Sequence, residues 1–448
     1  MSDSPDRMMA SIKGWFPERN VQEFTLSDPQ DFKRRVLQLA RQFDPVCYLD
    51  HNQYPDLLYH SFDALIGLGA EAFIQPNQAH FEALRALVDT KKTFLFGYLA
   101  YDLKNQIEKL QSRSYDPIGF PDLHFFEPKI WIGLHHSTCI IAVKEVDPNT
   151  VFDQIQSSPL PNIEPIQETC EILARMDRST YLEKVKAVKN HILEGDIYEL
   201  NFCQEFYCPQ AIIDPWETCW QLNQQSKAPF ASFYRLQEQY LIGGSPERFL
   251  KKEGKKLISQ PIKGTSKRGR NLSEDEQQKQ ALRASHKDQA ENVMIVDLVR
   301  NDLAKSCQSG TVNVEELFGI YAFENVFQMI STVTGELRPN VHLVEAIVNA
   351  FPMGSMTGAP KIRSMQLIEQ YEESRRGLYS GSVGYIDPNG NFDFNVVIRS
   401  ILYNAKDQYL SFQVGGAIVY DSIPEKEYEE CLLKATNVMK TLGLEWGN

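Results

Sequence analysis

A lysine between a proline and a glycine is the first candidate for chemistry in this chain. Lys263 stands in the hexapeptide 260–265, Gln-Pro-Ile-Lys-Gly-Thr, directly after the strand-like stretch 256–259. Pro261 cannot donate a hydrogen bond to a sheet, so we expect the strand to kink or end there, while Gly264 permits a turn or a close approach to a ligand. A partly desolvated lysine at a strand end can act as a nucleophile or base. The alternative is a surface lysine beside a loop.

Two expected helices carry carboxylates that share one face. Asp288 and Glu291 are three positions apart, and Glu427, Glu430 and Lys434 follow one another at i, i+3 and i+7. Two such pairs could form a site for Mg²⁺, which takes oxygen ligands and keeps several waters. The alternative is that both sets belong to solvated helix faces, where most Asp and Glu residues lie.

Three further stretches suit an anion. Residues 354–361, Gly-Ser-Met-Thr-Gly-Ala-Pro-Lys, do not have the spacing of a phosphate-binding loop, but their small residues and exposed amides at a helix start suit a carboxylate. At Gly415 and Gly416 the backbone can approach an anion closely. Arg399 follows the apolar stretch 396–398 and needs a partner there. It either forms a structural ion pair or clamps a carboxylate with two hydrogen bonds.

Strands and helices alternate irregularly around these residues. Patterning predicts helices over 27–42 and from Asp177 to Gly195, a long, interrupted helix over 274–306 and a final helix that Gly443 ends, with capping boxes at 273–276 and 422–425. Strands are expected at 92–99, 125–131, 137–146, 197–204, 230–236, 240–242, 325–333, 381–386, 395–402 and 410–414. The Pro/Ser/Asn-rich stretch 147–167 is the expected linker. It divides the chain into an N-terminal region, 1–160, and a catalytic domain, 168–445.

Composition narrows the class of protein. The chain has 448 residues, 42% of them apolar, and a formal net charge of −13, which argues against nucleic-acid or membrane-surface partners. No run approaches the roughly 18 apolar residues of a membrane span, and the acidic N-terminus lacks the apolar core of a signal peptide. The eight cysteines form no C-x-x-C pair. We therefore expect a cytoplasmic enzyme with buried thiols, not a disulfide scaffold or a zinc site.

The motifs together resemble the chorismate-utilising enzymes, and among them the aminodeoxychorismate synthases. They occur in the family's order across residues 175–440, with a weaker match at 96–102. The matching stretches are 195–198, 245–248, 261–265, 290–302, 354–361, 381–385, 398–399, 415–416 and 427–434.

This resemblance implies the fold class. It is α+β, with two packed antiparallel β-sheets, peripheral helices and an active-site cleft between the sheets. The N-terminal region is expected to contribute strands to this body and not to stand alone.

The resemblance also implies the binding residues. Glu291 and Glu430 would hold Mg²⁺, which binds the ring carboxylate of chorismate, with Asp288 and Glu427 as outer partners. The substrate's carboxylates and ether bridge would be bound by Tyr385, Arg399, Gly415, Gly416 and Lys434, while Thr357 and Gly358 would line the same cleft.

The same resemblance implies a covalent mechanism. Aminodeoxychorismate synthases have lysine in the P-I-x-G-T motif where anthranilate synthases have alanine, which makes Lys263 the nucleophile at ring C2. Glu247 would protonate the departing C4 hydroxyl, and ammonia would then add at C4 and expel the lysine. Because the reference pKa of lysine is about 10.4, we expect desolvation and Mg²⁺ to lower the pKa of Lys263.

Two positions depart from the family pattern, and one activity is missing. Gln328 replaces a histidine implicated in pyruvate elimination, and Glu199 stands where glutamine is frequent. The tryptophan-inhibition motif is also absent; its nearest counterpart is 48–51. No glutaminase motif is visible, so ammonia is expected from a separate glutaminase subunit. The product would be 4-amino-4-deoxychorismate, on the route to p-aminobenzoate and folate.

Two alternatives remain open. One is anthranilate synthase component I, and the other is a non-catalytic subunit that binds chorismate and regulates a partner.

Overall fold

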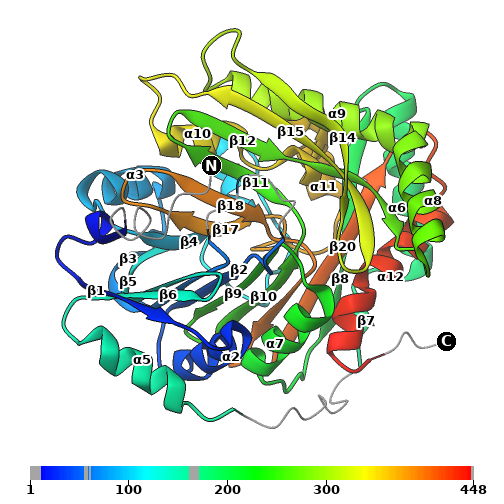
Figure 1. The fold of residues 1–448 in the computed structure, drawn as a ribbon. Coiled ribbons are helices and arrows are strands. Elements are labelled where there is room, and N and C mark those ends of the chain that lie inside the picture. Colours follow the sequence, from blue (N-terminus) through cyan, green and yellow to red (C-terminus); the bar gives the residue numbers. More distant parts are fainter. Residues whose placement is uncertain (1–11, 55–58, 60–61, 161–170, 445–448) are drawn as a thin grey trace.

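A computed structural model describes residues 12–54, 59, 62–160 and 171–444 (Figure 1). Its strands all belong to one hydrogen-bonded network, and the pairings between them are antiparallel. The network branches at the long strand β5 (Leu123–His135), whose first half pairs with β4 (Leu95–Leu99) and whose second half pairs with β6 (Thr138–Val143). Two sheets therefore share one strand.

The first sheet runs from β5 to β8, and β6 with β1 (Asn20–Thr25) extends it on the other side of β5. Its order continues through β3 (Ala64–Ile74), β2 (Val46–Asp50), β9 (Phe230–Leu236), β10 (Gln239–Ser245), β19 (Ser400–Asn404), β20 (Tyr409–Ile418) and β8 (Glu199–Cys208). Two short strands, β7 (Leu173–Ala174) and β16 (Gly358–Ala359), pair with opposite ends of β8.

The second sheet runs from β5 to β15. Its order is β4, β17 (Ser382–Ile386), β18 (Phe392–Val396), β11 (Arg248–Glu253), β12 (Lys256–Gln260) and β15 (Val326–Glu336), with β13 (Ile262–Lys267) and β14 (Asn313–Ala322) also paired with β15.

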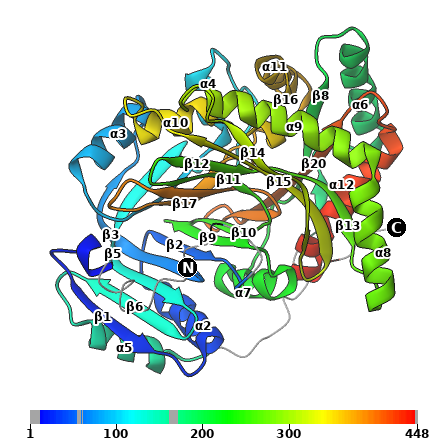
Figure 2. The same ribbon diagram turned by 45° about the horizontal axis from the view of Figure 1, so that its top comes forward.

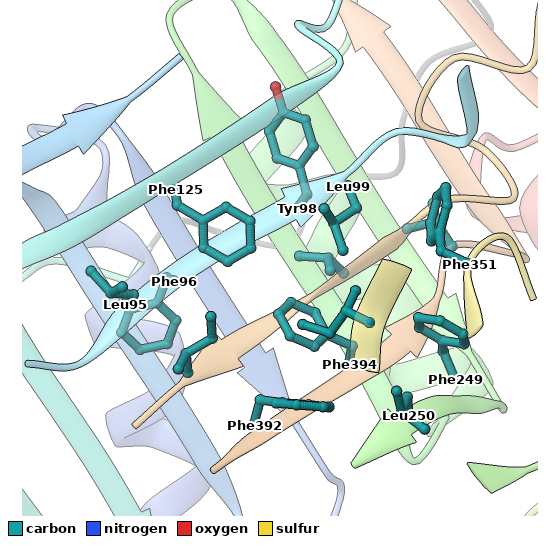
Figure 3. Packing of buried hydrophobic residues seen from close by; sticks show 14 of the residues in the cluster. Leu95, Phe96, Tyr98, Leu99, Phe125, Phe249, Leu250, Phe351, Phe392 and Phe394 are labelled. Carbon is teal, nitrogen blue, oxygen red and sulfur yellow. The ribbon is translucent and has the colours of Figure 1, made fainter. Parts of the chain in front are cut away.

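Aromatic side chains fill the space between the two sheets. The Tyr98 ring on β4 meets the Tyr234 ring on β9 edge-on, with the centroids 5.0 Å apart, and the Tyr234 hydroxyl lies 2.7 Å from the His124 imidazole. Figure 3 shows Phe125 and Phe394 in the same core, with ring centroids 6.0 Å apart. This packing confirms the predicted α+β class with two packed antiparallel sheets.

Helices cover the outer faces. The first sheet carries α2 (Pro29–Ala40), α5 (Pro148–Ser157), α6 (Arg178–Leu193), α7 (Pro215–Ser226) and α12 (Pro424–Thr441), whose apolar residues form a second core with it. Near the second sheet lie α3 (His80–Thr90), α4 (Lys104–Ile107), α8 (Leu272–Ala284), α9 (His286–Ala304) and α10 (Leu343–Ala350), and α9 crosses the outer face of β14 and β15 (Figure 2). Helix α11 (Lys361–Tyr371) instead packs against β8 and β16, and its Leu367 and Ile368 belong to the core of the first sheet.

Both predicted capping boxes are wrong. The side chain of Asn271 caps α8 by accepting a hydrogen bond from the Glu274 amide, and helix α12 begins at Pro424 without a side-chain cap. The hydroxyl of Ser422 accepts from the Val419 amide instead. The long helix predicted over 274–306 is indeed interrupted, because Ser285 ends α8 and caps α9.

The predicted linker is partly helical. Pro148 begins α5, Asp147 caps it, and Val151 and Ile155 pack against the first sheet. Residues 161–170 lie outside the described part of the chain, so the boundary between 1–160 and 168–445 stays a prediction. As expected, the N-terminal strands do not stand alone, because β2 pairs with β9 and β4 pairs with β17.

Two expectations from composition meet the structure here. None of the helices in the described ranges combines the length and apolar character needed to cross a membrane. Six cysteines are free and buried as expected: Cys47, Cys139, Cys203, Cys219, Cys307 and Cys431. Cys208, in contrast, is disulfide-bonded, so the expectation of thiols does not hold for that residue.

Candidate active site

A β-bulge sets the orientation of the Lys263 side chain. Strand β12 ends at Gln260 and β13 begins at Ile262, which confirms the predicted kink at Pro261. Between Ile262 and Thr265 the register against β15 shifts by one residue, and Gly264 has φ +92°, a conformation that favours glycine. Bulges redirect side chains away from the regular alternation of a strand. The lysine is thus turned out of the ladder toward the first sheet.

Lys263 forms an ion pair between the two sheets. Its ammonium donates a hydrogen bond to Oε1 of Glu199, at the start of β8, at 2.6 Å, and the two side chains are only 12% and 1% exposed. Burial disfavours the ammonium, but the charges of Glu199, Glu291 and Glu247 outweigh it and raise the pKa of Lys263. Carboxylates surround the amine and keep this pKa high, whereas the expected lowering depended on Mg²⁺ as well as on desolvation and stays a prediction.

Glu247 lies where the chain crosses from the first sheet to the second. It occupies the turn between β10 and β11, and its carbonyl accepts a hydrogen bond from the Val396 amide at 3.0 Å. Burial raises the pKa of Glu247 to about 7, while the Ser355 hydroxyl and the charge of Lys263 act in the opposite direction. A carboxyl with this pKa can hold a proton near neutral pH and donate it.

The four predicted metal ligands lie on two helices that reach this region. The charge of Lys287 acts on Glu291 of α9 and on both Glu427 and Glu430 of α12. Burial raises the pKa of Glu291 and of Glu427. Burial also acts on Glu430, but the Lys434 ammonium at 2.6 Å outweighs it and lowers the pKa of Glu430.

These carboxylates do not form a tight cluster. Within the described ranges, one group of three possible ligands has its atoms within 4.8 Å of one another, and it is His191, Glu194 and Asp196 on the surface. Both ring nitrogens of that histidine already face partners, Asp196 and Tyr371, so this group is not a metal site. The predicted set nevertheless fits a hard cation, since two of its buried carboxyls resist ionisation and a cation would relieve them.

Next to the carboxylates, Gly416 leaves a small hollow. A Cβ at Gly416 would lie 3.3 Å from an oxygen of Glu427, 3.6 Å from an oxygen of Glu430 and 3.6 Å from the Lys434 amine. The Lys434 amine donates to the Gly415 carbonyl at 2.8 Å. The structure therefore brings these five residues together, as the sequence predicted for the substrate and metal sites.

Arg399 occupies a second crossing between the sheets, between β18 and β19. Its guanidinium donates to the Lys434 carbonyl at 3.5 Å, and none of the described carboxylates forms an ion pair with it. It lines a cavity together with Lys434, Thr265 and Gln328. The structural ion pair is therefore not seen among the described residues, and the carboxylate clamp stays a prediction.

The stretch 354–359 closes the site beside Glu199. Residues Gly358 and Ala359 pair with Leu200 and Glu199, and a Cβ at Gly358 would lie 2.2 Å from the Glu199 carbonyl, so only glycine fits there. Thr357 is fully buried, and its hydroxyl donates to carbonyls of its own loop at 3.2 and 3.3 Å. This segment fixes the start of β8 and, with it, Glu199.

Tyr385 is the one predicted substrate residue that lies elsewhere. Its ring stacks on Phe94 with centroids 5.1 Å apart, and it lines a separate cavity between the sheets. That cavity also contains Asp50 and His51, from the stretch compared above with a tryptophan-inhibition motif.

Two residues of the site were not predicted. Tyr379 is buried, and its phenol lies near the Arg399 guanidinium. The only signal in the sequence was its place in the turn between Gly377 and Gly381. Glu199 was noticed only as a departure from a family pattern, and no spacing rule could pair it with a lysine 64 residues away.

Comparisons with known proteins agree with this arrangement. Residues 45–440 match the family described as chorismate binding enzyme. The chain belongs to this family of chorismate binding enzymes. Among its relatives, an anthranilate synthase component I-like protein of Synechocystis is 36% identical over 354 residues, which are 77% of this chain and 72% of that protein. Aminodeoxychorismate synthase component 1 of Escherichia coli is 34% identical over 348 residues, covering 77% of this chain and 76% of that protein.

A solved structure supports the fold. Anthranilate synthase component I from Streptococcus pneumoniae superposes with a TM-score of 0.74 at 24% identity, over 86% of this chain and 94% of that one. The chorismate binding enzyme described here therefore has the fold that its sequence implied.

Proposed function

We propose that this chorismate binding enzyme is an aminodeoxychorismate synthase component I. It converts chorismate and ammonia to 4-amino-4-deoxychorismate, and a separate glutaminase subunit supplies the ammonia. The observation that carries the proposal is the buried amine of Lys263, with the charges of Glu199, Glu247 and Glu291 acting on it, in a chain related to aminodeoxychorismate synthases.

In the proposed reaction, Lys263 and Glu247 act in sequence. The neutral amine attacks C2 of chorismate, the two ring double bonds shift, and the C4 hydroxyl leaves as water with the proton of Glu247. Ammonia then forms a bond to C4, the double bonds shift back, and the lysine nitrogen leaves C2 as a neutral amine. A proton of the new ammonium at C4 returns to the Glu247 carboxylate. Because hydroxide is a poor leaving group, a carboxyl that is still protonated near pH 7 is the acid this step needs, and two allylic steps replace one difficult displacement.

Magnesium is the cofactor that the carboxylate set supports. Glu291 and Glu430 would hold it, with Asp288 and Glu427 as outer partners, and the bound ion would neutralise the ring carboxylate of the substrate. Arg399 and Lys434 supply fixed positive charge for the substrate's carboxylates, at the cavity both residues line.

Mass analysis of the products tests the proposed function. Purified protein is incubated with chorismate, Mg²⁺ and ammonium, and the expected product is 4-amino-4-deoxychorismate. Fluorescent anthranilate without an added lyase would show anthranilate synthase component I instead. The absence of any Mg²⁺-dependent turnover would leave the non-catalytic subunit as the better account.

A further inference from the structure

The carboxylate of Glu199 is only half used. Its Oε1 accepts the hydrogen bond from Lys263 at 2.6 Å. Its Oε2 is buried and has no hydrogen-bond partner in the described part of the chain. Buried carboxylate oxygens are normally hydrogen-bonded, so such an atom needs an explanation.

The backbone holds Glu199 in place from two sides. Its carbonyl accepts a hydrogen bond from the Ser364 hydroxyl at 3.2 Å, and its strand pairs with β16 on one edge and with β20 on the other. The carboxylate is thus presented to Lys263 by a rigid element, which is how a group that exchanges a proton with a reacting atom must be held.

The other acidic groups that face Lys263 are more distant. Glu247 from the β10–β11 turn, Glu291 from α9 and Glu430 from α12 all act on its charge. None of them comes within 4.0 Å of the Lys263 amine in the described structure. Glu291 is engaged by Lys287 at 3.7 Å and Glu430 by Lys434 at 2.6 Å. Among the described acidic residues, Glu199 alone lies within hydrogen-bond distance of the amine.

We propose that Glu199 is the catalytic base that takes a proton from the Lys263 ammonium before the amine attacks C2. The inference rests on the proposed function. One N–H bond of the ammonium breaks, an O–H bond forms on Oε1 of Glu199, and the lone pair left on nitrogen forms the bond to C2. When ammonia has displaced the lysine, the proton returns from Glu199 to the amine and the ion pair is restored.

Substrate binding favours this transfer. Chorismate in the cleft displaces water, so the charged pair loses solvation, and a neutral amine beside a neutral carboxyl becomes less costly than it is in water. A glutamine, which is frequent at this position in the family that the sequence resembles, cannot accept the proton. This chain should therefore activate its lysine internally.

The first half-reaction isolates the role of Glu199. Wild type and Glu199→Gln are mixed with chorismate and Mg²⁺ without ammonia between pH 6 and 9, and the rate of adduct formation on Lys263 is followed by intact mass. We expect Glu199→Gln to be slower by about 100-fold at pH 6. The deficit should shrink by about tenfold per pH unit, because the variant lysine must lose its proton to water. A deficit that is the same at every pH would mean a purely structural role and would overturn the proposal.

Two variants serve as controls. Glu205→Gln removes another buried carboxylate of β8, one that pairs with Arg175 and lies outside the site, and it should follow the wild-type pH profile. Glu199→Asp keeps a base and should show a deficit that does not change with pH.

A measurement without turnover separates the two proposals. Reductive methylation of Lys263, quantified by peptide mass against pH, should reach its midpoint at lower pH in Glu199→Gln than in wild type. An unchanged midpoint would overturn the role of Glu199 and leave the proposed function intact. A wild-type protein that forms no adduct and no product would instead refute the proposed function.

Discussion

The protein contains two buried lysine–carboxylate pairs that differ in how completely they are satisfied. Lys33 of α2 donates to Asp50 of β2 at 2.8 Å, and both side chains are 1% exposed. The two oxygens of Asp50 also accept hydrogen bonds from the Asn52 amide, the Tyr48 hydroxyl and the Asn223 side chain. At Lys263 and Glu199 the distance is similar, but one carboxylate oxygen has no hydrogen-bond partner among the residues that the structure describes.

We propose that this difference separates a structural pair from a pair that takes part in the chemistry. A saturated pair has no capacity left for a ligand and only holds its elements together, whereas an unsaturated pair retains a reactive atom and can exchange a proton. Position agrees with this reading, because Lys33 and Asp50 join a helix to one sheet, while Lys263 and Glu199 face each other from different sheets.

Removing the Lys263 amine should give the largest loss of activity. We expect Lys263→Ala to lose aminodeoxychorismate formation by a factor on the order of 10⁴ and to lose the covalent adduct. Product mass and intact mass measure the two. Because Glu199 is buried and loses its counterion in this variant, the free energy of unfolding should fall as well. An adduct on this variant would refute Lys263 as the nucleophile.

Removing Lys33 should lower the stability of the protein and leave its activity unchanged. Lys33→Met leaves Asp50 as a buried charge without its counterion, so the free energy of unfolding should fall by about 3–5 kcal/mol. Urea unfolding measures the loss, and residual kcat per folded molecule should stay near that of the wild type. A variant as stable as the wild type would show that the pair of Lys33 and Asp50 is not structural.

Glu430 tests the proposed Mg²⁺ site, which lies near Lys263 and not near Lys33. Changing Glu430 to Gln removes one proposed ligand charge, and the Mg²⁺ concentration for half-maximal activity should rise by about 10- to 100-fold. Glu205→Gln again provides the matched control. Unchanged metal dependence would remove Glu430 from the ligand set.

The pH dependence should show Glu247 directly. The pKa of its carboxyl is raised to about 7, so the proton is present below that pH and lost above it. At constant free ammonia, kcat/KM should therefore fall about tenfold per pH unit above pH 7. Glu247→Gln should remove this limb of the profile along with most of the activity. A profile that stays level to pH 9 would contradict the assignment.

Local rules predicted much of the fold and part of the site. Pro261 predicted the kink before Lys263, and the i, i+3 spacing predicted that Glu427 and Glu430 share one helix face. What could not be predicted depends on tertiary contacts. Asn271 caps α8 in place of a more regular capping box, and the partners of Lys263 and Arg399 come from distant parts of the chain. A pairing such as Lys263 with Glu199 exists only once the two sheets have closed on each other.

The two sheets are joined at one strand, β5, which both of them share. Strands β8 and β13 lie toward the ends of the two sheets that are opposite to β5. The contact between Lys263 and Glu199 connects the sheets there. Glu247 and Arg399 lie where the chain passes from one sheet to the other. A ligand that binds between the two sheets would meet the contact between Lys263 and Glu199 there, so its binding would be coupled to the state of this ion pair.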